Sequence, residues 1–113
     1  MEITRHVENG VNVIKVAGKI DGLTSETVIN AFLSQVNGGT PRLVADLEGV
    51  DYTSSAGLRA LLAIQKAVRQ SGGELRLASV QPYVFKVLDM SGFTSIFKIY
   101  GDVGSAVASF NAA

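Results

Sequence analysis

The chain has 113 residues, 47% of them hydrophobic, which is enough for one core without disulfides or metals. Cysteine is absent from the sequence, which excludes a disulfide framework and a thiolate metal site and fits a reducing compartment. Ten basic and ten acidic residues give a formal net charge of zero, which argues against nucleic acid as the main ligand.

The first predicted elements are a hairpin and a helix. Two runs rich in β-branched residues flank the Asn-Gly pair at 9–10, which is a strong hairpin signal. Thr24 is then a favourable N-cap for a helix whose apolar positions continue at helical spacing to Val36. Residues 37–39 (Asn-Gly-Gly) are expected to end this helix, because glycine readily adopts the left-handed cap conformation.

Strands and helices alternate in the rest of the chain. Residues 43–47 form an apolar run with one carboxylate, Asp46, which is typical of a central strand covered on both faces. Further strands are expected at residues 74–80 and 96–100, and helices beginning at Ser54 or Ser55, at Pro82 and at Asp102. The order β-β-α-β-α-β-α-β-α predicts an α/β fold in a single domain over residues 1–113. Its mixed sheet has about five strands, parallel except for the N-terminal hairpin, and it has four helices.

Motifs for catalysis or nucleotide binding are absent from the sequence. The single histidine, His6, falls in the first strand, and no Gly-x-Ser-x-Gly elbow or Gly-rich phosphate loop occurs. The Gly-Gly pairs at 38–39 and 72–73 both follow predicted helices, which they are expected to terminate. We therefore expect a protein that is not an enzyme and that holds no metal or cofactor.

The segment 51–57 is the best candidate for a functional site. It joins the central strand to a strongly amphipathic helix, at the sheet edge where open α/β sheets place their ligands. A helix start accepts an anion on its free N–H groups, so it would stabilise a phosphate on a serine there. Such a phosphate presents a charge of about −1.5 to −2. The alternative is that Ser54 or Ser55 only caps the helix.

Two carboxylates, Asp21 and Asp46, could share this neighbourhood. Asp21 follows the second strand, and its alternative is a solvated loop residue. Asp46 lies within an apolar strand, where a charge needs partners. Its alternative is a structural hydrogen-bond acceptor for a neighbouring turn.

Four stretches of the sequence carry a family resemblance. They are Gly18-Lys19-Ile20-Asp21 followed by Thr24, residues 43–47 with Asp46, residues 52–59 (Tyr-Thr-Ser-Ser-Ala-Gly-Leu-Arg) and residues 88–93 (Leu-Asp-Met-Ser-Gly-Phe). In this order and spacing they resemble the STAS domain of the bacterial anti-sigma factor antagonist family, and the resemblance runs over almost the whole chain. It implies the STAS fold.

The resemblance also implies a binding switch. Unphosphorylated proteins of this kind bind an anti-sigma factor that is also a serine kinase of the histidine-kinase-like ATPase type, and sigma factor is released. The kinase uses ATP to phosphorylate the loop serine, which ends binding, and a serine phosphatase resets the switch. Nucleotide would reach this chain only through the kinase.

Because no apolar run approaches the roughly 20 residues of a membrane span and the start lacks the layout of a signal peptide, a cytoplasmic protein is expected.

Counting back from Gly57 in the family's pattern assigns the phosphate acceptor to Ser55. Ser54, which stands where the family carries Asp, is the second choice, and Ala56 in the second hydroxyl position cannot accept. The expected partner-binding residues are Asp21, Thr53, Ser54, Ser55, Gly57, Leu58 and Arg59, with Asp46 in support. The alternative function is a STAS subunit of a lipid or anion transport complex, or of another signalling assembly, because these proteins share the fold.

Overall fold

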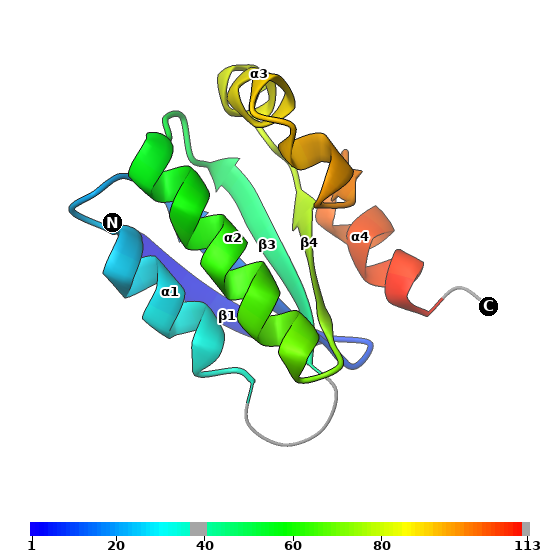
Figure 1. The fold of residues 1–113 in the computed structure, drawn as a ribbon. Coiled ribbons are helices and arrows are strands. Elements are labelled where there is room, and N and C mark those ends of the chain that lie inside the picture. The colour runs from blue at the N-terminus through cyan, green and yellow to red at the C-terminus, as the bar shows by residue number, and fades with distance from the viewer. Residues whose placement is uncertain (37–40, 112–113) are drawn as a thin grey trace.

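A five-stranded mixed sheet with helices on both faces makes up the part of the chain that the computed structural model describes, residues 1–36 and 41–111. The strands are β1 (Glu2–Glu8), β2 (Val11–Ala17), β3 (Arg42–Gly49), β4 (Glu74–Ala78) and β5 (Ile99–Tyr100). The helices are α1 (Ser25–Leu33), α2 (Ser55–Gln70), α3 (Pro82–Met90) and α4 (Val103–Phe110), with a 3-10 turn, η1 (Phe93–Ser95), after α3. Figure 1 shows α1 and α2 side by side across one face of the sheet.

The strand order is β1-β2-β3-β4-β5, antiparallel between β1 and β2 and parallel elsewhere. Asn9 and Gly10, with φ of 50° and 78°, give the turn of the β1–β2 hairpin the positive φ angles of a type I′ connection. The predicted order of elements and the predicted mixed sheet are therefore confirmed.

Several element boundaries differ from the prediction. Helix α1 ends at Leu33 and does not reach Val36, because Gln35 and Val36 donate their backbone N–H groups only three residues back, as in a 3-10 turn. The expected helix stop at 37–39 lies outside the described residues. Strand β4 ends at Ala78, where Ser79 takes a φ of 57° that a strand does not allow. The expected strand at 96–100 is reduced to β5.

Apolar side chains pack on both faces of the sheet, as predicted for the central strand. On one face, Leu43, Ala45 and Leu47 of β3 lie in the larger core, which also holds side chains of α1, α2 and α3. On the other face, Val44 packs with residues of α4 in a second cluster. Because successive strand residues point to opposite faces, β3 separates the two clusters.

One buried polar side chain was not predicted. Gln65 of α2 is 1% exposed, and its amide donates to the carbonyl of Leu75 at 3.0 Å and accepts from the backbone N–H of Leu75 at 2.8 Å. Both polar ends of the side chain are thus paired, which makes its burial tolerable. This pair of hydrogen bonds ties α2 to the start of β4.

Candidate functional site

The candidate site is built where the loop from β3 reaches α2, beside the segment that follows β2 (Figure 1). Ile20, which is 1% exposed, forms an isolated parallel bridge with Thr53. Its N–H donates to the carbonyl of Tyr52 at 3.1 Å, and its carbonyl accepts from the N–H of Ser54 at 3.2 Å. The two loops are therefore held together by backbone hydrogen bonds, in the manner of a short extra piece of sheet.

Gly57 allows this close approach. A Cβ atom at Gly57 would stand 2.1 Å from the carbonyl oxygen of Ile20 and 2.3 Å from Oγ1 of Thr53. Both distances are far shorter than any ordinary contact, so the first turn of α2 can lie against Ile20 only because residue 57 has no side chain. Gly57 thus positions the site and offers no side chain to a partner.

The three hydroxyl residues at the start of α2 have different environments. Thr53 is 4% exposed, and its Oγ1 donates to the carbonyl of Ile20 at 3.0 Å. Ser54 is the N-cap of α2 and half-buried, and its Oγ accepts from the N–H of Gly57 at 3.3 Å. Ser55, the first residue of the helix, is exposed. The capping role therefore belongs to Ser54, and Ser55 presents its hydroxyl to solvent.

Asp21 organises the turn that leads into α1. One of its carboxylate oxygens, Oδ1, accepts from the N–H groups of Leu23 at 3.0 Å and Thr24 at 3.2 Å. The Thr24 hydroxyl accepts from the N–H of Asp21 at 3.0 Å and donates to the carbonyl of Lys19 at 2.7 Å. Thr24 thus stands at the N-cap position without capping α1 by its side chain. Asp21 is half-buried and hydrogen-bonded rather than freely solvated.

Of the two residues after Gly57, one is buried and one is exposed. Leu58 is 8% exposed and belongs to the larger core, whereas Arg59 is exposed. Among the expected partner-binding residues, Ser55 and Arg59 therefore have exposed side chains. Thr53, Gly57 and Leu58 are buried and support this surface without being exposed on it.

Asp46 is not brought to this site. It lies on the same face of β3 as Val44, which packs against α4, while α2 covers the opposite face. Its Oδ1 accepts from the N–H of Glu48 at 3.1 Å, at the end of the strand. The structural alternative, an acceptor for a neighbouring turn, is the arrangement that the structure has.

Exposed apolar side chains beside Ser55 were not predicted from the sequence. Leu23 is 94% exposed. Its neighbour Gly22 lies close to the first turn of α2, because a Cβ atom added at Gly22 would stand 3.8 Å from Cβ of Ala56. Tyr52, 38% exposed, stacks on Tyr83 of α3 with ring centroids 6.2 Å apart. We call Leu23, Tyr52 and Tyr83 the apolar rim of the site. A leucine just before a helix reads in sequence as a buried staple, so no local signal marks its exposure.

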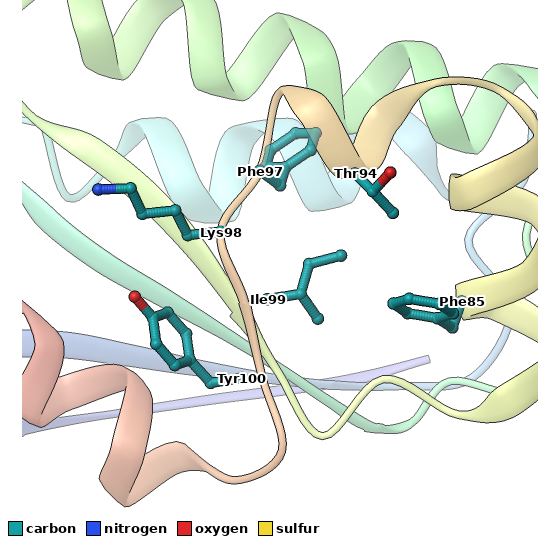
Figure 2. Close-up of a pocket in the computed structure, with 6 residues that line it drawn as sticks. All are labelled: Phe85, Thr94, Phe97, Lys98, Ile99 and Tyr100. Carbon is teal, nitrogen blue, oxygen red and sulfur yellow. The ribbon is translucent and has the colours of Figure 1, made fainter.

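A hollow of about 390 Å³ lies elsewhere, between α3, η1 and β5. Figure 2 shows Phe85, Phe97 and Ile99 gathered around it, while the Lys98 side chain extends away from Phe85. None of the candidate site residues lines this hollow, and its polar groups do not converge on one point, as they do in most ligand sites.

Residues 1–36 and 41–111 contain no group of three or more His, Asp or Glu side chains that could hold a metal ion. No helix in these residues combines the length and the apolar character needed to cross a membrane.

Comparison with known proteins agrees with the motifs. The family described as "STAS domain" matches residues 2–106. BtrV of Bordetella bronchiseptica, whose name describes an anti-sigma factor antagonist, is 36% identical over 113 residues, which cover 100% of this chain and 97% of BtrV. The anti-sigma F factor antagonist of Paenibacillus polymyxa is 30% identical over 112 residues, which cover 95% of this chain and 92% of that protein.

Solved structures share the fold. An anti-sigma factor antagonist (STAS) domain protein from Planctomyces limnophilus has a TM-score of 0.87 at 25% identity, over 97% of this chain and 98% of that one. The murine anion transporter Slc26a9 has a TM-score of 0.82 at 17% identity, over 92% of this chain and 18% of the transporter, and this likeness shows the fold alone. The chain belongs to the STAS domain proteins of the anti-sigma factor antagonist family.

Proposed function

We propose that this chain is an anti-sigma factor antagonist whose unphosphorylated form binds an anti-sigma factor through the surface around Ser55, and that phosphorylation of Ser55 ends binding. The observation that carries the proposal is the pairing of an exposed serine with an exposed apolar rim. Ser55 at the start of α2 and Leu23 on the loop after β2 are both exposed, and backbone hydrogen bonds of Ile20 hold these two segments together. Exposed apolar side chains grouped on one surface are typical of protein-binding sites.

The environments of the two serines support Ser55 as the phosphate acceptor. The Ser54 hydroxyl is half-buried and already accepts from the N–H of Gly57 as the cap of α2, so a kinase would have to open this contact to reach it. Ser55 is exposed and can enter a kinase active site without any change in α2. We assign the acceptor to Ser55 for this reason as well as for its place in the motif.

The modification is a phosphoryl transfer from ATP. The Ser55 Oγ forms a bond to the γ-phosphorus and loses its proton, the bond from that phosphorus to the bridging oxygen breaks, and ADP leaves. We propose that the anti-sigma factor itself supplies ATP and the catalytic groups, as a kinase of the histidine-kinase-like ATPase type. A separate serine phosphatase then hydrolyses the phosphate ester. This chain needs no nucleotide site or catalytic group for these steps. Because ATP and sigma factor are found in the cytoplasm, we expect the chain to act there.

Electrostatics explain how one phosphate can release the partner. The phosphate brings a charge of about −1.5 to −2 into a contact that excludes water. An uncompensated charge in such a contact costs several kcal/mol, and every 1.4 kcal/mol is about a tenfold change in affinity. Affinity should therefore fall by roughly a hundredfold or more without a change of fold.

The proposal is tested with ATP, intact-mass measurement and an anti-sigma factor kinase of the histidine-kinase-like ATPase type from the same organism. Wild type should gain one phosphate, Ser55→Ala should gain none, and Ser54→Ala should still gain one. Ser55→Ala should bind the kinase as wild type does, whereas Ser55→Asp should bind more weakly by calorimetry. Equal phosphate incorporation in Ser55→Ala and wild type would refute the assignment, and unchanged affinity of Ser55→Asp would refute the electrostatic switch.

The alternative, a STAS subunit of a transport complex, has weaker support. The transporter likeness concerns the fold, which many partners can use. The relatives at 30% identity or more over nearly the whole chain carry antagonist names. A subunit used only for docking also needs no exposed hydroxyl at residue 55. If the neighbouring genes encode a transporter and no kinase, the alternative is favoured.

A further inference from the structure

Helix α2 carries only positive charges. Its charged residues are Arg59, Lys66 and Arg69, and its first turn contains no acidic residue. An acidic group in the first turn normally stabilises a helix, because the free N–H groups there carry partial positive charge. An unmodified α2 therefore lacks the favourable charge in its first turn, and the first charged residue along the helix is Arg59.

Arg59 stands one helical turn after Ser55. Residues four apart on a helix are neighbours on its surface, and long side chains lean toward the helix N-terminus. An arginine at position 59 can therefore reach the turn that Ser55 begins, and both residues are exposed.

The other two cations of α2 are placed differently. Arg69 donates to the carbonyl of Ile96 at 2.9 Å, so its guanidinium is already engaged. Lys66 is exposed and lies about three turns beyond Ser55. Within residues 1–36 and 41–111, no side-chain hydrogen bond or ion pair engages Arg59. Arg59 is thus the cation of α2 that is available at the site.

We propose that Arg59 binds the phosphate of phosphorylated Ser55 within the same chain, which rests on the proposed function for the existence of that phosphate. The planar guanidinium offers two parallel N–H groups to two phosphate oxygens, the geometry in which arginine binds phosphate most strongly. Phosphorylation then changes the docking surface twice. It adds a dianion at Ser55 and removes the free cation at Arg59 that an acidic partner group would use.

The test installs phosphoserine at position 55 by genetic code expansion, so that no kinase is needed. The second pKa of the phosphate is then followed by phosphorus NMR in wild type, in Arg59→Gln and in the matched control Lys66→Gln. A nearby cation favours the dianion, so the pKa should be about 0.2–0.4 pH unit lower in wild type than in Arg59→Gln. Lys66→Gln, which removes the same charge from the same helix, should keep the wild-type value.

Thermal unfolding supplies an independent readout. Phosphorylation should raise the melting temperature of wild type by about 2–4 °C and that of Arg59→Gln by clearly less, because the pair exists only when both groups are present. Equal pKa values in the phosphorylated wild type and Arg59→Gln, together with equal thermal shifts, would overturn the proposal. Failure of a kinase to modify Ser55 would instead refute the proposed function and leave these measurements unaffected.

Discussion

Replacing Gly57 by alanine is the sharpest test of how the site is held. The added Cβ would stand 2.1 Å from the carbonyl oxygen of Ile20 and 2.3 Å from Oγ1 of Thr53. Carbon and a carbonyl oxygen approach each other to about 3.3 Å in proteins. The start of α2 must therefore retreat from Ile20 by roughly 1.2 Å, the difference between these two C···O distances.

This retreat breaks two hydrogen bonds to the carbonyl of Ile20. The N–H of Ser54 is 3.2 Å and Oγ1 of Thr53 is 3.0 Å from the carbonyl of Ile20, and both would be carried beyond hydrogen-bond range. Each lost bond costs about 1 kcal/mol, and the overpacking itself costs about 1–3 kcal/mol. The free energy of unfolding of Gly57→Ala should fall by about 3–5 kcal/mol, out of the 5–15 kcal/mol typical of a domain.

Urea denaturation and thermal unfolding followed by circular dichroism measure this loss. The melting temperature should drop by about 10–20 °C. Two controls carry the same change: Gly101→Ala, where nothing lies within 4 Å of the added Cβ, and Gly22→Ala, where the nearest atom is Cβ of Ala56 at 3.8 Å. Both should stay within about 0.5 kcal/mol of wild type. If Gly57→Ala unfolds within 1 kcal/mol of wild type, roughly the cost of one hydrogen bond, the close approach is not what holds the two loops together.

Three more substitutions test the surroundings of the site and the last helix. Asp21→Ala should lower the free energy of unfolding by about 1–2 kcal/mol in urea denaturation, because two backbone N–H groups of its turn lose their acceptor; a value equal to wild type would mean that the turn forms without it. Leu23→Ala should leave the melting temperature unchanged but weaken anti-sigma factor binding by about tenfold in calorimetry. The control Met90→Ala, at a side chain that is 78% exposed at the far end of α3, should alter neither quantity. If both variants lose binding equally, Leu23 has no special role. Asp102 caps α4, and the backbone hydrogen bond from Ser105 lowers the pKa of its carboxyl from the ordinary 3.8. The charged carboxylate therefore stabilises the fold above pH 3.8. This stabilisation is lost as the pH falls through the lower pKa of the folded state. Asp102→Asn keeps an acceptor oxygen without the charge, so its stability measured between pH 2 and pH 5 should depend less on pH; an unchanged pH profile would argue against this role.

Elements specified by local chemistry could be predicted from the sequence. The Asn9-Gly10 turn and the start of the last helix at Asp102 depend on backbone preferences of the residues themselves, and the structure has both, with Asp102 as the N-cap. Elements that depend on distant contacts could not. Gln65 is buried because Leu75, ten residues later, meets both ends of its amide. Helical periodicity alone predicts a polar residue such as Gln65 on the solvent face.

The candidate site shows the same division between local and distant causes. The sequence could not decide between Ser54 and Ser55 as the cap, because adjacent hydroxyl residues fit a helix start equally well. The decision comes from Ile20, more than thirty positions earlier, which bonds the N–H of Ser54 and so determines where the loop ends and α2 begins. The expectation that Asp46 supports the site depended on which face of the sheet α2 would cover, and that is a property of the whole fold.

The exposure of Ser55 follows from the burial of Gly57. One residue of an α-helix turns the chain by about 100°, so a side chain two positions before Gly57 points roughly 200° away from it. Since Gly57 must face Ile20, Ser55 must face solvent, and Arg59, four positions after Ser55, returns to nearly the same direction. Counting back from the glycine of the motif therefore selects an exposed serine for a physical reason. The residue that cannot carry a side chain sets the rotation of the helix, and that rotation presents the serine and the arginine together.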